Sequence, residues 1–108
     1  MITVSLFRNQ SRQITGFTVS GHAGYGEKGT DIVCAAVTTA AMTAVNGLTD
    51  AAGIQLTPVV REGYLVCTLP EVLSETERHD ADLLLESMVL TMQNLASQYG
   101  DYVSLCEK

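Results

Sequence analysis

Residues 13–37 read QITGFTVSGHAGYGEKGTDIVCAAV, a strand followed by a glycine-rich loop and the start of a helix. In the first part apolar and polar residues alternate, but the apolar positions change register at Gly16. This slip indicates a β-bulge within a strand over residues 13–20. The next ten residues, 21–30, include four glycines, which disfavour a regular element and predict a surface loop.

A long helix is predicted from Asp31 to about Ala52. Thr30 or Asp31 can cap its first N–H groups, and Gly53 is a suitable stop. Its apolar side chains share one face and most of them are small, so the helix can pack closely on a sheet. They are Val33, Val37, Ala40, Ala41, Ala44, Val45 and Leu48.

Three more strands are indicated on either side of this helix. Residues 2–6 alternate in the pattern of a strand with one buried face. Residues 55–61 and 64–69 flank Glu62-Gly63, which is a tight hairpin signal. Pro58 lacks an N–H, so the first of these two strands is expected at an edge or in an irregular position.

A second helix is predicted from the capping box Ser74-Glu75-Thr76-Glu77 to Gly100, and a last strand over residues 102–106. The apolar side of the helix carries Leu84, Leu85, Met88, Val89, Met92 and Leu95. The resulting ββαββαβ order predicts one domain over residues 1–108. Its fold class is α/β (α+β type), a sandwich of two amphipathic helices on a mixed or mostly antiparallel five-stranded sheet.

Composition argues against several classes of function. The net charge is −6 and the basic residues are scattered, so the basic patch of a nucleic-acid-binding protein is missing. Three cysteines without a close pair do not suit a disulfide-framed secreted domain. No charged and apolar leader precedes the first strand, and the weakly polar stretch 32–45 is too short to span a bilayer. We expect a cytoplasmic protein without a nucleic-acid or membrane partner.

Cys34 and His22 are the first candidates for chemistry. Cys34 lies in the first turn of its helix, where free N–H groups and a nearby imidazolium would favour the nucleophilic thiolate. His22 lies between two small residues across the loop and is of the type that most often acts as a general base. Together they would suffice for attack on a carbonyl and protonation of a leaving amine. The simpler alternatives are a buried apolar thiol and a solvated loop histidine.

Asp31 and Thr38 are candidate supporting residues. Asp31 either caps the helix or orients His22 as the third member of a triad, and the sequence leaves both roles open. Main-chain N–H groups at the helix start, including that of Cys34, could stabilise an oxyanion. Thr38 follows one turn after Cys34 and could offer a hydroxyl, although a helical threonine more often bonds to its own backbone.

The other candidate residues are less suited to a catalytic role. Cys67 and Cys106 lie in strand patterns and are interpreted as core or half-buried thiols, and His79 as a solvated residue of an acidic helix. No Cys-x-x-Cys or His-x-x-x-His spacing supports a zinc site, and the glycine loop lacks the Gly-Lys-Ser/Thr of a phosphate-binding loop. No metal or organic cofactor is expected.

The segments Gly16-Phe17, Gly21-His22-Ala23, Gly29 and Asp31-Ile32-Val33-Cys34-Ala35-Ala36-Val37 resemble the signature of Prp, the ribosomal-processing cysteine protease family of Firmicutes and related bacteria. The resemblance implies that His22 and Cys34 form the catalytic dyad and that Asp31 supports it. It also implies that the loop orders over a bound peptide through Ala23, Gly24, Tyr25, Gly26 and Gly29. Thr38 stands where the family often has Ser, so the hydroxyl is retained.

The resemblance further implies a substrate and an oligomeric state. The family removes a short N-terminal extension from ribosomal protein twenty-seven of the large subunit, after a hydrophobic and aromatic segment, and its members are homodimers. This chain is therefore expected to hydrolyse a peptide bond by thiolate attack. Two alternatives are a non-catalytic factor that binds or assembles a ribosomal protein, and a redox-sensing thiol.

Overall fold

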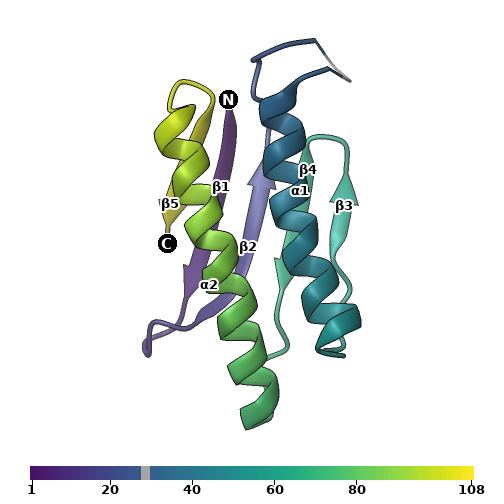
Figure 1. Ribbon diagram of the computed structural model, residues 1–108. Coiled ribbons are helices and arrows are strands. Elements are labelled where there is room, and N and C mark those ends of the chain that lie inside the picture. Colours follow the sequence, from purple (N-terminus) through teal and green to yellow (C-terminus); the bar gives the residue numbers. More distant parts are fainter. Residues whose placement is uncertain (28–29) are drawn as a thin grey trace.

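The computed structural model describes residues 1–27 and 30–108. Its elements follow the predicted ββαββαβ order (Figure 1). One π-helical turn follows directly after the first helix. They are β1 (Ile2–Arg8), β2 (Ile14–Ser20), α1 (Ile32–Asn46), η1 (Gly47–Ala51), β3 (Val59–Arg61), β4 (Tyr64–Thr68), α2 (Glu75–Gln98) and β5 (Val103–Glu107).

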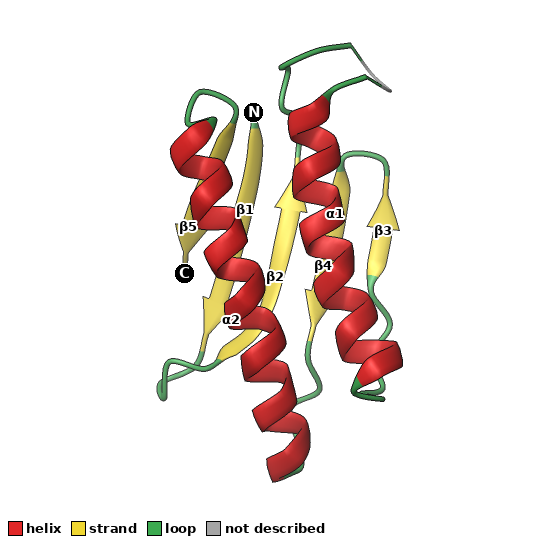
Figure 2. Cartoon of the chain, viewed as in Figure 1, coloured by secondary structure: helices red, strands yellow, loops and turns green. Residues whose placement is uncertain are grey.

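The five strands form one mixed sheet in the order β3-β4-β2-β1-β5, and both helices cover the same face of it (Figure 2). The β1–β5 pair is parallel and the other pairs are antiparallel, so the predicted fold class is confirmed. β3 is an edge strand, as Pro58 indicated. It is shorter than the predicted 55–61, because it begins at Val59, directly after that proline.

The predicted bulge in β2 is present, one residue before Gly16. Phe7 pairs with Gly16 and the next residue of β1, Arg8, pairs with Ile14, so Thr15 has no partner in the ladder. The extra residue restores the register, and the apolar side chains on both sides of it face the helices. The buried face of the sheet comprises Ile2, Val4, Leu6, Ile14, Phe17, Val19, Leu65, Cys67 and Val103.

Both helices bury the faces that the sequence predicted. From α1 and η1 the buried residues are Val33, Val37, Ala41, Ala44, Val45 and Leu48, and from α2 they are Ala81, Leu85, Met88, Val89 and Met92. The joined α1–η1 segment, Ile32–Ala51, has 20 residues and is long and apolar enough to cross a membrane. It is thus longer than the stretch 32–45 considered above. A core helix with one buried face can also be this long and this apolar.

Gly21 fixes the direction in which the chain leaves the sheet. It has φ +90°, and a Cβ at this position would lie 2.4 Å from the carbonyl oxygen of Met1. Its N–H donates to the carbonyl oxygen of Gly63 in the β3–β4 turn at 2.9 Å. These contacts bring the loop after β2, the β3–β4 turn and the start of α1 to one end of the sheet (Figure 1).

Candidate active site

A cleft of about 440 Å³ lies where β2 ends and α1 begins. It brings together the side chains between residues 22 and 38 that were predicted to share a site. Its walls are formed by His22, Gly24, Gly26, Asp31, Cys34, Ala35, Thr38 and Glu62. Glu62 was not predicted as a site residue. The sequence identified it only as part of the Glu62-Gly63 turn and did not indicate what that turn would contact.

Cys34 is half-buried in the first turn of α1 and its sulfur faces the loop. The main-chain N–H of Ala23 donates to Cys34 Sγ, with 3.3 Å between nitrogen and sulfur. Ala23 itself is buried, with 3% of its surface exposed. The residue directly after His22 is therefore tied to the thiol.

His22 is exposed and its ring lies against the β3–β4 turn. A Cβ at Gly63 would be only 2.8 Å from His22 Nε2, so the absence of a side chain at this turn leaves room for the imidazole. His22 and Cys34 line the same cleft, and both also line a second, smaller cavity of about 170 Å³. Between these two residues the chain does return from the end of β2 to the start of α1, as the prediction required.

Asp31 is the N-cap of α1 and uses both carboxylate oxygens. Oδ1 accepts the N–H groups of Val33 and Cys34 at 3.0 Å each. Oδ2 accepts those of Tyr25 and Gly26, at 3.0 and 3.2 Å. The N–H of Cys34 contributes most to holding the pKa of this carboxyl below its usual value, and the other three N–H groups act in the same direction against desolvation.

These bonds bear on the two roles left open for Asp31. Within residues 1–27 and 30–108, it caps the helix and holds the loop, and no hydrogen bond joins it to His22. They also change the expectation for the oxyanion site. The N–H of Cys34 is already bonded to Asp31, and that of Ala35 donates to the main-chain oxygen of Asp31 at 3.0 Å. In this structure the predicted donors at the helix start are occupied.

Tyr25 anchors the loop to the far end of the chain. Its ring packs edge-on against Tyr99, with 5.7 Å between centroids, and against Tyr102, at 5.1 Å. The sequence prediction missed this cluster, since no local pattern relates an aromatic loop residue to two others more than 70 positions away. Of the other predicted loop residues, Gly24 and Gly26 line the cleft, Ala23 is buried and bonded to Cys34 Sγ, and Gly29 is outside the described residues.

Thr38 is exposed and lines both the cleft and the smaller cavity. Thr43 of the same helix donates to the carbonyl oxygen of Thr39, the usual bond of a helical threonine. In the part of the chain that is described, the hydroxyl of Thr38 makes no such bond. It is therefore available to a molecule in the cleft.

The remaining thiols and the second histidine lie away from the cleft, as predicted. Cys67 is buried, and burial raises its pKa to about 11. Cys106 is half-buried, with its sulfur 3.8 Å from Ser104 Oγ. His79 is exposed, and its Nδ1 lies 3.2 Å from a carboxylate oxygen of Asp80.

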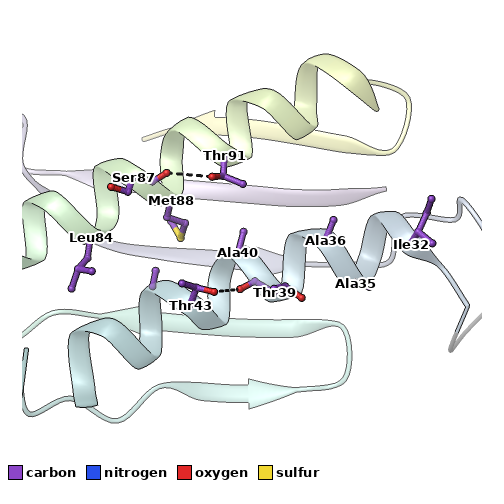
Figure 3. A pocket seen from close by; sticks show the side chains of 11 residues that line it. Ile32, Ala35, Ala36, Thr39, Ala40, Thr43, Leu84, Ser87, Met88 and Thr91 are labelled. Atoms are coloured by element: carbon purple, nitrogen blue, oxygen red, sulfur yellow. Dashed lines mark hydrogen bonds between the residues drawn. The ribbon is translucent and has the colours of Figure 1, made fainter. Parts of the chain in front are cut away.

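A larger groove of about 550 Å³ runs between α1 and α2 (Figure 3). Its walls are mostly small and apolar, and no ionisable side chain is among them. They are Ile32, Ala35, Ala36, Thr39, Ala40, Thr43, Ala44, Leu84, Ser87, Met88 and Thr91. General acid–base or nucleophilic chemistry therefore belongs to the other cleft.

An accessible imidazole and a thiol at a helix start, facing one cleft, are the parts that a cysteine protease uses. Comparison with known proteins leads to the same class. Residues 1–104 match the profile of the family described as Cysteine protease Prp, and the chain belongs to that family. It is therefore a cysteine protease.

Several characterised relatives are similar over nearly the whole chain. The ribosomal processing cysteine protease Prp of Bacillus subtilis is 34% identical over 103 residues, which cover 94% of this chain and 92% of that protein. The Staphylococcus aureus Prp is 30% identical over 108 residues and 97% of both chains. A crystal structure of S. aureus Prp with a covalently linked product peptide has a TM-score of 0.88 and 26% identity, and covers both chains fully.

Replacing Asp31 should separate its two roles. In Asp31→Asn the amide oxygen can still accept from Val33 and Cys34, but its NH₂ cannot accept from Tyr25 and Gly26. We expect faster amide hydrogen exchange at the loop residues with little change at the helix start. Asp31→Ala should accelerate exchange at both. Equal protection of the loop in wild type and Asp31→Asn would contradict this.

The difference in folding stability between wild type and Asp31→Asn should depend on pH. Because the pKa of Asp31 is lowered by folding, its carboxylate contributes stability that is fully present above the ordinary aspartate pKa, about 4. This contribution is lost as the pH falls through the lowered value. The stability difference between wild type and Asp31→Asn in urea titrations should accordingly shrink toward the acid end.

The three thiols should differ in reactivity. At pH 6, iodoacetamide should modify Cys34 first, since its sulfur lies at a cleft and already accepts an N–H. Cys67 should stay unmodified, because it is buried and its thiol remains protonated until about pH 11. Peptide mass mapping over time would measure the order, with Cys34→Ser as the control. Uniformly slow labelling of all three would argue against an activated Cys34.

Proposed function

We propose that this protease removes the N-terminal extension of ribosomal protein twenty-seven of the large subunit, cutting after a hydrophobic and aromatic segment. Two relatives with 34% and 30% identity are named as ribosomal processing proteases. A structure of S. aureus Prp with a substrate peptide matches the whole chain with a TM-score of 0.83. The shared cleft of His22 and Cys34 is the observation that carries the proposal.

The proposed reaction uses these two side chains in sequence. His22 takes the thiol proton of Cys34, and the thiolate adds to the carbonyl carbon of the peptide bond. The C–N bond then breaks, and the imidazolium gives its proton to the leaving amine. Water then attacks the thioester while His22 takes one of its protons, the C–S bond breaks, and the imidazolium returns this proton to the departing sulfur. The acid product loses its own proton to solvent and leaves as the carboxylate.

The smaller cavity supports a substrate with an apolar residue at the cut. His22 and Cys34 are among the residues that line it, and its lining also includes Val19, Ala41 and Leu65, which are all buried. Its volume is about 170 Å³. A dry engineered cavity of about 150 Å³ holds one benzene, so this space suits a single phenyl or branched aliphatic side chain.

The charge of the chain supports a basic partner. Its net charge of −6 would attract a basic ribosomal protein and oppose direct binding of nucleic acid. The setting that we propose is the cytoplasm, where ribosomal proteins are made and a free thiol stays reduced.

Incubation with the extended ribosomal protein tests the proposed activity directly. We expect mass spectrometry to show a new N-terminus after the hydrophobic segment. Cys34→Ala should lower the rate by on the order of 10⁴-fold or more, and His22→Ala by about 10²–10⁴-fold. His79→Ala is the matched control, because this histidine is exposed on α2 away from the cleft.

The outcomes of this assay separate the candidate functions. Tight binding of the ribosomal protein without cleavage would support the alternative of a non-catalytic assembly factor. Cleavage by Cys34→Ala at the wild-type rate would show that Cys34 is not the nucleophile.

We also propose that the enzyme is a homodimer, as the family resemblance implies. Sedimentation equilibrium at micromolar concentration should give twice the chain mass of 11.6 kDa. A single species at the mass of one chain across the concentration range would contradict the dimer.

A further inference from the structure

Thiolate attack on a peptide bond places a negative charge on the carbonyl oxygen, and an enzyme needs a fixed donor at that point. We propose that the main-chain N–H of Ala23 is this donor, and that the same N–H binds the Cys34 sulfur before attack. The proposal rests on the proposed cysteine-protease function and adds a catalytic group to it.

Four other main-chain donors around the cleft already have partners. At the helix start, the N–H groups of Val33 and Cys34 are bonded to Asp31 Oδ1. In the loop, those of Tyr25 and Gly26 are bonded to Asp31 Oδ2. Turning any of these toward a substrate would leave part of a carboxylate that is only 8% exposed without a donor, which is costly.

The N–H of Ala23 differs from these because its partner is the reacting atom. The nitrogen lies 3.3 Å from Cys34 Sγ, and only 3% of the residue is exposed. Its position is fixed on both sides. Before it, Gly21 is bonded to Gly63, and after it, Tyr25 and Gly26 are bonded to Asp31. A donor held in this way is preorganised and needs no rearrangement during the reaction.

The reaction itself transfers this hydrogen bond from sulfur to oxygen. When the S–C bond forms, the electron pair of the C=O π bond moves to oxygen, and the sulfur loses its negative charge. The sulfur is then a poor acceptor. The oxyanion is bonded to the carbon that the sulfur has just joined, so it lies within reach of a donor already in contact with the sulfur. When the C–N bond breaks, the carbonyl re-forms and the donor is released.

Replacing the Ala23 amide with an ester tests this assignment without changing any side chain. Residues 1–33 are synthesised with lactic acid in place of Ala23, which removes the N–H and keeps the methyl group. They are joined to residues 34–108 by native chemical ligation at Cys34, which leaves no foreign residue. The matched control carries an ester at Ser11, in the exposed β1–β2 turn.

Two rates are measured on each folded protein: cleavage of the extended ribosomal protein and alkylation of Cys34 by iodoacetamide. Alkylation forms no oxyanion, so it reports only on the sulfur. We expect the Ala23 ester to lower kcat by about 10²–10³-fold, and the alkylation rate by far less. Unchanged kcat, or an equal loss in both rates, would overturn the proposal. Absence of cleavage by the all-amide ligated protein would instead refute the proposed function.

A measurement on the unmodified enzyme covers the case in which the ester variant does not fold. A peptide aldehyde ending in phenylalaninal would form a hemithioacetal with Cys34, whose oxygen stands where the oxyanion would be. In protein labelled with ¹⁵N-alanine, the Ala23 amide proton should shift downfield and gain protection from exchange when the adduct forms. An unchanged Ala23 signal in a fully formed adduct would overturn the assignment.

Discussion

The site depends on one carboxylate that joins two separate segments of backbone. Asp31 accepts two N–H groups from the first turn of α1 and two from the loop that follows β2. Buried donors without partners are costly, so the charge both begins the helix and gives the loop its shape. The helix start sets the position of the Cys34 sulfur, and the loop aims the Ala23 N–H at it.

Most of the fold could be predicted because its signals are local. Alternation in β1, the slip near Gly16, the capping box before α2 and the small apolar face of α1 each depend on neighbouring residues, and all were confirmed. The strand order and the parallel β1–β5 pair depend on long-range contacts and were left open. β3 was predicted over 55–61 but spans only Val59–Arg61, because Pro58 delays pairing until Val59.

The residues of the site could be predicted, but the hydrogen bonds and contacts that they make could not. The residue types and spacing of His22, Asp31 and Cys34 suggested one site, and the structure places all three at one cleft. Their catalytic roles stay predictions. The choice of Asp31 partners depends on the loop path, and the contact of His22 with Gly63 depends on the β3–β4 turn reaching the end of β2. Sequence spacing does not predict contacts of this kind between separate segments.

The contact of Tyr25 with Tyr99 and Tyr102 has a consequence for biosynthesis. A ribosome makes a chain from its N-terminus, so the two tyrosines that brace the loop emerge more than 70 residues after Tyr25. β5, which follows them, then pairs in parallel with β1, with Val103 opposite Ile2. Pairing between segments so far apart in sequence is intrinsically slow. A nascent chain would thus carry its thiol for some time before the surrounding peptide is braced, which would delay proteolytic competence until both tyrosines have emerged and packed.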